Sequence, residues 1–158
     1  MTPNKRILVI DDDPAILTTY RLILQPGTQS SWDATGKELF GPLEAQTPPP
    51  APLPFDLTLQ AQPEAGVQAA RDARDRGRPF AGAFVDMKMP RMDGIQVIRE
   101  LIRIDPRMGL ALVTAQSGPP PRADLDLPRE TTLLFLAKPF SAGELRRTAR
   151  EMTRQWNP

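Results

Sequence analysis

The chain has 158 residues, which suits one domain with a sizeable hydrophobic core and leaves no room for a second folded domain. Lysine and arginine number 20 and aspartate and glutamate 19, so the formal net charge of +1 creates no overall field favouring nucleic acid or an anionic membrane. The sequence contains no histidine, which excludes a histidine phosphosite, Ser-His or Cys-His catalysis and imidazole metal ligands.

The sequence also contains no cysteine, as is common in a reducing compartment. No apolar run approaches the roughly 20 residues that a membrane-spanning helix needs, and no signal peptide precedes Lys5 and Arg6. We therefore expect a cytoplasmic protein that does not bind membranes.

Short apolar runs alternate along the chain with segments of helical spacing. The expected elements, in chain order, are a strand over 5–10, a helix over 14–24, a strand over 55–60, a helix over 63–76, a strand over 81–85, a helix over 94–104, strands over 109–113 and 133–137, and a helix from 141 to near 156. Asp13 is expected to cap the first helix, Gly77 to end the second, and Ser141 with Glu144 to form a capping box on the last.

Continuous apolar strands that alternate with helices predict a parallel α/β sheet covered on both faces. Asp11, Asp12, Asp86, Thr114 and Lys138 each follow one of the apolar runs directly. In open α/β sheets, ligands bind beyond the carboxyl ends of the strands, so these side chains are expected to converge at one edge.

Three carboxylates in one cleft repel one another, and a hard divalent cation is the usual way to stabilise such a cluster. Mg²⁺, or Mn²⁺ in its place, is the expected ion. Because Mg²⁺ prefers carboxylates together with phosphate oxygens, the expected substrate carries a phosphoryl group.

Four segments, in this order and each at the end of a strand, resemble the motifs of response-regulator receiver domains. They are VIDDDP (residues 9–14), FVDMKMPRMDG (84–94), VTA (113–115) and AKPF (137–140). The resemblance implies a flavodoxin-like, doubly wound, five-stranded parallel sheet with strand order 2-1-3-4-5. It also implies a phosphoprotein of two-component signalling with no enzymatic activity beyond its own phosphorylation and dephosphorylation.

Carried over to this sequence, the resemblance makes Asp86 the phosphoacceptor. Asp12 is then a direct Mg²⁺ ligand, Asp11 binds the ion mainly through water, and the backbone carbonyl of Lys88 completes the protein ligands. Lys138 neutralises charge on the phosphoryl group. The phosphoryl donor is a histidine kinase, a phosphotransfer protein or a small acyl phosphate.

The resemblance assigns further roles around this centre. Thr114 is the switch hydroxyl and Phe135 the aromatic residue that turns inward on activation, while Pro139 follows a cis peptide bond. Lys88 and Gln116 set the rate at which the aspartyl phosphate is hydrolysed. Lys88 is expected to shield the phosphoryl group and slow hydrolysis, and the alternative is that Gln116 orients water and speeds it.

Two segments depart from the family pattern. Residues 27–54 form a long, proline-rich insertion, interpreted either as a lid on the first helix and the sheet edge or as a docking surface for a kinase or neighbouring domain. Between Thr114 and the last strand, four residues reading GPPP (118–121) and then Pro128 predict that the family's fourth helix is short or irregular. The resemblance therefore does not predict that activation uses the family's usual dimer face, which includes this helix. The oligomeric state is left open.

Residues 1–158 are expected to form a single receiver, either stand-alone or cut from a larger signalling protein, with the output domain linked or separate and no direct contact with nucleic acid. One alternative is a receiver-like docking module that takes no phosphate. Another is a phosphohydrolase of the haloacid dehalogenase type, whose Asp-x-Asp, Thr and Lys would be matched by residues 11–13, Thr114 and Lys138. That reading leaves the motif around Asp86 unexplained.

Overall fold

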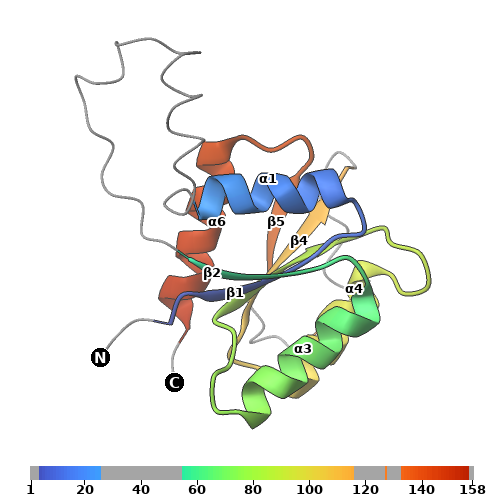
Figure 1. Ribbon diagram of the computed structural model, residues 1–158, viewed down its shortest axis with the longest axis vertical. Coiled ribbons are helices and arrows are strands. Elements are labelled where there is room, and N and C mark those ends of the chain that lie inside the picture. Colours follow the sequence, from blue (N-terminus) through green and yellow to red (C-terminus); the bar gives the residue numbers. More distant parts are fainter. Residues whose placement is uncertain (1–3, 26–54, 116–126, 128–132, 157–158) are drawn as a thin grey trace.

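One five-stranded parallel sheet forms the centre of the protein (Figure 1). The computed structural model describes residues 4–25, 55–115, 127 and 133–156. The strands are β1 (Arg6–Ile10), β2 (Asp56–Gln60), β3 (Gly82–Asp86), β4 (Gly109–Thr114) and β5 (Leu133–Ala137). Their order, β2-β1-β3-β4-β5, confirms the predicted doubly wound topology.

Helices cover both faces of this sheet. They are α1 (Pro14–Leu24), α3 (Pro63–Asp75), α4 (Gly94–Ile104) and α6 (Ala142–Gln155). Figure 1 shows α1 and α6 on one face and α3 and α4 on the other. The insertion over 27–54, Gln116 and the GPPP segment before β5 lie outside the described residues, so the predictions for them stay predictions.

The central strands are apolar on both faces because each face packs against a layer of helices. Leu8 and Ile10 of β1 belong to the core on the α3 and α4 side, while Ile7 and Val9 belong to the core beneath α1 and α6. All four side chains are fully buried. This alternation fixes the register of β1, since a shift by one residue would exchange its two faces.

The helix ends follow local sequence rules. The Asp13 carboxylate accepts a hydrogen bond from the Ala15 amide at 2.9 Å, and the Ser141 hydroxyl accepts one from the Glu144 amide at 3.1 Å. Gly77, just beyond α3, has φ +73°, a conformation that glycine adopts without strain. The predicted cap at Asp13 and stop at Gly77 are therefore confirmed. None of the helices in the described part of the chain combines the length and hydropathy needed to cross a bilayer.

A buried carboxylate fixes the turn between α4 and β4. Asp105 is only 2% exposed and accepts hydrogen bonds from the Arg107 amide and Nε, each at 3.0 Å. The Arg107 guanidinium also lies 5.5 Å from the ring centroid of Trp156, just beyond α6. One arginine thus connects the start of β4 to the end of the last helix.

Arg107→Ala should lower the free energy of unfolding by about 1–3 kcal/mol, because it removes a charged donor from a buried carboxylate. The matched control is Arg103→Ala, whose Nη1 lies 3.0 Å from Glu100 at a largely exposed position. That pair should contribute less than about 1 kcal/mol. Urea unfolding of both variants measures the difference, and equal losses would contradict the role given to Asp105.

Candidate functional site

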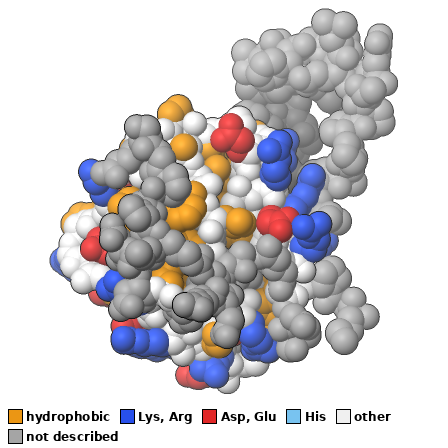
Figure 2. Space-filling model, turned by 180° about the vertical axis from the view of Figure 1, so that it is seen from behind, with side chains coloured by type: hydrophobic (Ala, Val, Ile, Leu, Met, Phe, Trp, Pro, Cys, Tyr) orange, Lys and Arg blue, Asp and Glu red, His pale blue; other side chains and the backbone are white. Residues whose placement is uncertain are grey.

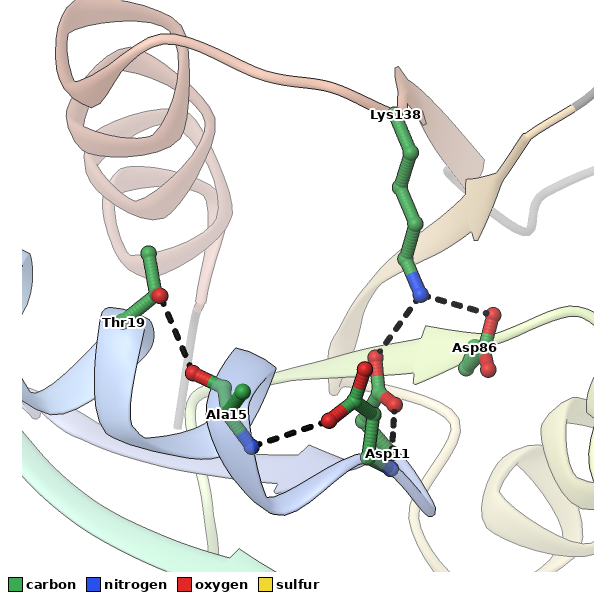
Figure 3. A network of polar contacts seen from close by, with 6 residues as sticks. Asp11, Ala15, Thr19, Asp86 and Lys138 are labelled. Atoms are coloured by element: carbon green, nitrogen blue, oxygen red, sulfur yellow. Dashed lines mark hydrogen bonds and ion pairs between the residues drawn. The ribbon is translucent and has the colours of Figure 1, made fainter.

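Four of the five strands bring polar residues to one edge of the sheet. Asp86 and Thr114 are the last residues of β3 and β4, Asp11 directly follows β1, and Lys138 directly follows β5. The Lys138 Nζ lies 3.0 Å from Asp11 Oδ2 and 3.4 Å from Asp86 Oδ1 (Figure 3). Carboxylate oxygens of Asp11, Asp12 and Asp86 all lie within 4.8 Å of one another.

The predicted convergence of these residues is therefore present in the structure. Thr114 lies at the same edge, where its carbonyl oxygen accepts a hydrogen bond from the Lys138 amide at 2.8 Å, and it is only 4% exposed. The peptide bond between Lys138 and Pro139 is cis, as the resemblance implied.

The three consecutive aspartates occupy three different environments. Asp11 is 1% exposed, and its two oxygens accept hydrogen bonds from the Asp13 amide and the Lys138 ammonium, both at 3.0 Å. Asp12 is exposed and contributes an oxygen to the cluster. The Asp13 carboxylate instead accepts a hydrogen bond from the Ala15 amide in the first turn of α1. An Asp-x-Asp catalytic pair formed by Asp11 and Asp13 therefore has no geometric support.

Burial raises the pKa of Asp86, and the neighbouring Asp11 charge raises it further, while Lys138 acts in the opposite direction. Burial on its own would lower the pKa of Lys138, but contact with Asp11 and Asp86 outweighs it, and the result is a raised pKa. Lys138 therefore stays cationic in neutral solution. One ammonium does not balance three carboxylates, so the cluster carries excess negative charge.

That excess charge and the oxygen-only donor set fit a hard divalent ion such as Mg²⁺ or Mn²⁺. Asp11, Asp12 and Asp86 are the residues whose side chains could hold it. Lys88, whose backbone carbonyl is the predicted fourth protein ligand, is exposed in the loop after β3.

Without metal, Asp86→Asn should make the protein more stable at neutral pH, and the gain should shrink on acidification. The folded state raises the pKa of Asp86 above its ordinary value near 3.8, so its protonated form stabilises the fold. That contribution is fully present below the ordinary pKa and is lost as the pH rises through the folded-state pKa. Thermal unfolding in a chelator across this pH range is the measurement, and a wild type more stable than the variant at neutral pH would contradict the expectation.

Phe135, the predicted switch aromatic, is 37% exposed, the exposed large hydrophobic residue among those the structure describes. It belongs to the edge strand β5. Figure 2 shows hydrophobic side chains at the surface of the face seen from behind, with lysine and arginine side chains toward its rim. An inward turn of Phe135 would remove apolar surface from water, a change that a partner could sense.

Two features of the loop from β3 to α4 were not predicted from the sequence. Asp93 and Gln96 form a reciprocal capping box at the start of α4, with the Gln96 amide donating to Asp93 Oδ1 at 2.9 Å. Gly94 packs directly against the backbone of Asp86 and Met87. The capping rule applied to Ser141 would have found the first, since Asp and Gln stand three residues apart. The second is a contact between backbone segments and leaves no sequence pattern.

No protein-family model matches the chain. Among curated proteins it is 38% identical over 72 residues to the C4-dicarboxylate transport transcriptional regulatory protein DctD of Rhizobium meliloti (strain 1021), a match covering 45% of this chain and 15% of that protein. It is 34% identical over 67 residues to the response regulator receiver protein CpdR of Brucella abortus (strain 2308), covering 42% and 54%. The matches thus span about half or less of these relatives.

Among solved structures, the fold is similar to a CheY-like response regulator receiver domain protein of Methanospirillum hungatei JF-1, with a TM-score of 0.65, 21% identity and 96% of each chain covered. It is also similar to a response regulator receiver protein of Sinorhizobium medicae WSM419, with a TM-score of 0.63, 19% identity and 98% of each chain covered. The sequence matches and the shared fold confirm the resemblance that the four motifs indicated.

Proposed function

We propose that this chain, which resembles response-regulator receiver domains in sequence and in fold, is a phosphoacceptor receiver with Asp86 as the residue phosphorylated. One observation carries the proposal: the Lys138 ammonium lies within 3.4 Å of both Asp11 and Asp86 at an edge where three carboxylates converge. A carboxylate at the end of a buried strand, with a cation beside it, is suited to accept a phosphoryl group.

In the proposed reaction an Asp86 oxygen attacks the phosphorus of a phosphohistidine or of a small acyl phosphate. An O–P bond to Asp86 forms as the bond from phosphorus to the donor breaks, and the donor leaves as imidazole or as carboxylate. Lys138 pairs with the phosphoryl oxygens, and the Thr114 hydroxyl donates a hydrogen bond to one of them. Asp11, Asp12, Asp86 and the Lys88 carbonyl would hold Mg²⁺, which supplies further neutralisation of charge when bound.

The proposed partner is a histidine kinase or a phosphotransfer protein, because such a protein carries the phosphohistidine that the proposed reaction consumes. Phosphorylation adds about −1.5 to −2 charge and new acceptor oxygens beside Thr114. The resulting movement of Thr114 and Phe135 would carry the signal to an output domain, linked or separate.

The test is the intact mass of the protein after incubation with acetyl phosphate, with Mg²⁺ or with a chelator. A gain of one phosphoryl group that needs Mg²⁺ and is lost in Asp86→Asn supports the proposal. Asp75→Asn, an equivalent change at an exposed position of α3, is the control and should still be phosphorylated. Failure to form the adduct despite measured Mg²⁺ binding would favour a docking module that takes no phosphate.

Lys88→Ala should shorten the lifetime of the aspartyl phosphate several-fold. Lys88 is exposed two residues after Asp86, where its side chain can cover the phosphoryl group against water. The measurement is the decay of the adduct after acetyl phosphate is removed. An unchanged decay rate would remove Lys88 from this role, and slower decay in Gln116→Ala would assign the tuning to Gln116.

A further inference from the structure

Three aromatic rings form a continuous row beneath the candidate site. Tyr20 of α1 lies in the middle, with its ring centroid 5.2 Å from that of Phe84 in β3 and 5.5 Å from that of Phe140. The rings are tilted by 52° and 50°, within the range of favourable edge-to-face contacts. Tyr20 is 1% exposed and Phe84 is fully buried.

The two ends of this row are close in sequence to two site residues. Phe84 stands two residues before Asp86, and Phe140 stands two residues after Lys138. Phe84 is fixed within a central strand, whereas Phe140 belongs to the connection between β5 and α6. The Tyr20 ring is therefore the bridge between the strand that presents Asp86 and the connection that presents Lys138.

The connection needs such support because its lysine is a long, flexible side chain. The backbone of the connection between β5 and α6 is hydrogen-bonded to the sheet at one point, where the Lys138 amide donates to the Thr114 carbonyl at 2.8 Å. On the other side of Lys138, the half-buried Phe140 packs against the core under α1 and α6. Loss of the Tyr20 ring would release Phe140 from this contact and let the Lys138 ammonium move away from Asp86.

We propose that Tyr20 is a positioning residue for phosphoryl transfer, whose ring holds Phe140 and thereby keeps Lys138 beside Asp86. The inference rests on the proposed function, because it assigns Tyr20 a part in phosphorylation of Asp86. Tyr20 acts through Phe140 and Lys138 and does not touch the phosphoryl group.

The aromatic ring of Tyr20 performs this role, and ionisation of its hydroxyl does not contribute. Burial raises the pKa of Tyr20 well above its ordinary value, and the charges of Asp11 and Asp86 raise it further. The hydroxyl is therefore protonated under all ordinary conditions. Phenylalanine supplies the same ring and is the conservative replacement.

The experiment compares two quantities in each variant: the phosphorylation rate of Asp86 at saturating acetyl phosphate and Mg²⁺, and the Mg²⁺ affinity from calorimetry. Tyr20→Leu should lower the rate about tenfold or more, since small misplacements of a catalytic group are costly. Mg²⁺ affinity should change little, because Asp11, Asp12 and Asp86 stay in place. Tyr20→Phe should restore the rate.

Phe55→Leu is the matched control. It deletes a buried ring from the same core cluster at the opposite end of the sheet, next to the start of β2. It should destabilise the fold without changing the phosphorylation rate. Phe140→Leu removes the other ring of the contact at a half-buried position and should repeat the effect of Tyr20→Leu, which covers the case in which Tyr20→Leu does not fold.

A wild-type rate in folded Tyr20→Leu or Phe140→Leu would overturn the inference and leave the proposed function intact. Parallel losses of rate and Mg²⁺ affinity, as from general loosening of the site, would also overturn it. A wild type that forms no adduct would overturn the proposed function itself, so the two failures are distinguishable.

Discussion

Gly94→Ala should abolish most of the proposed phosphoryl transfer to Asp86 and lower the free energy of unfolding by about 1–3 kcal/mol, the range for overpacking a close contact. A Cβ at this position would collide with the Asp86 carbonyl oxygen and would lie 2.8 Å from Met87 Cα. Alanine is otherwise the better residue in a helix, so a loss here isolates the steric effect.

The backbone on the other side of this contact has little freedom to move. The Met87 amide donates to the Val113 carbonyl at 2.8 Å, and the Met87 carbonyl accepts from the Gly94 amide at 2.9 Å. Relief of the collision would therefore shift α4 or the end of β3, and either shift moves the Asp86 carboxylate relative to Lys138. A displacement of this kind should lower the reaction rate, because catalysis of phosphoryl transfer depends mainly on the positions of the reacting groups and on neutralisation of their charge.

Gly143→Ala is the matched control, since it makes the same substitution in the first turn of α6. The nearest atom to a Cβ there is the Ser141 hydroxyl oxygen, at 3.9 Å. Stability should stay the same or rise by up to about 1 kcal/mol, with an unchanged phosphorylation rate. Urea unfolding and the acetyl phosphate reaction measure both variants, and equal behaviour of the two would show that contact with Asp86 does not constrain position 94.

The strands and the residues at their carboxyl ends could be predicted because they depend on residues that are close together in the sequence. An apolar run such as residues 7–10 has one plausible place, a strand buried on both faces, and the residue after it must then lie at the edge. Asp13 and Gly77 could be assigned for the same reason, because capping depends on neighbours within a few residues.

Other features could not be predicted because they depend on contacts between distant segments. Gly94 meets the backbone of Asp86 only after α4 has docked on the sheet, and Tyr20 is one apolar helix residue among several until Phe84 and Phe140 lie beside it. Asp11 is buried and Asp12 is exposed although they are neighbours in the sequence, and Asp11 accepts a hydrogen bond from Lys138, which is 127 positions away in the chain.

Lys138→Met should lower the rate of Asp86 phosphorylation about 100-fold or more, the scale expected for removing a group that stabilises developing charge. The same change should destabilise the metal-free protein by about 3 kcal/mol, because it leaves the buried Asp11 carboxylate without its cation. Methionine keeps most of the length and apolar character of the side chain. Charge, more than packing, is therefore the quantity removed.

Lys5→Met is the control for net charge. Lys5 directly precedes β1, at the opposite edge of the sheet from the site. The Lys5→Met substitution makes the same change in net charge as Lys138→Met and should leave both the phosphorylation rate and the Mg²⁺ affinity unchanged. A comparable loss in Lys5→Met would mean that overall charge, and not the ammonium beside Asp86, governs the reaction.

The stability deficit of Lys138→Met should shrink as the pH falls, which separates an electrostatic cause from a packing defect. Lys138 lowers the pKa of Asp86 against the effects of burial and Asp11, so its removal raises that pKa further. Protonation of Asp86 in the folded state then offsets part of the lost attraction as the pH falls through the raised pKa toward the ordinary value near 3.8. Thermal unfolding of the variant and the wild type in a chelator gives the deficit at each pH. A deficit that does not change with pH would assign the loss to packing around the lysine stem.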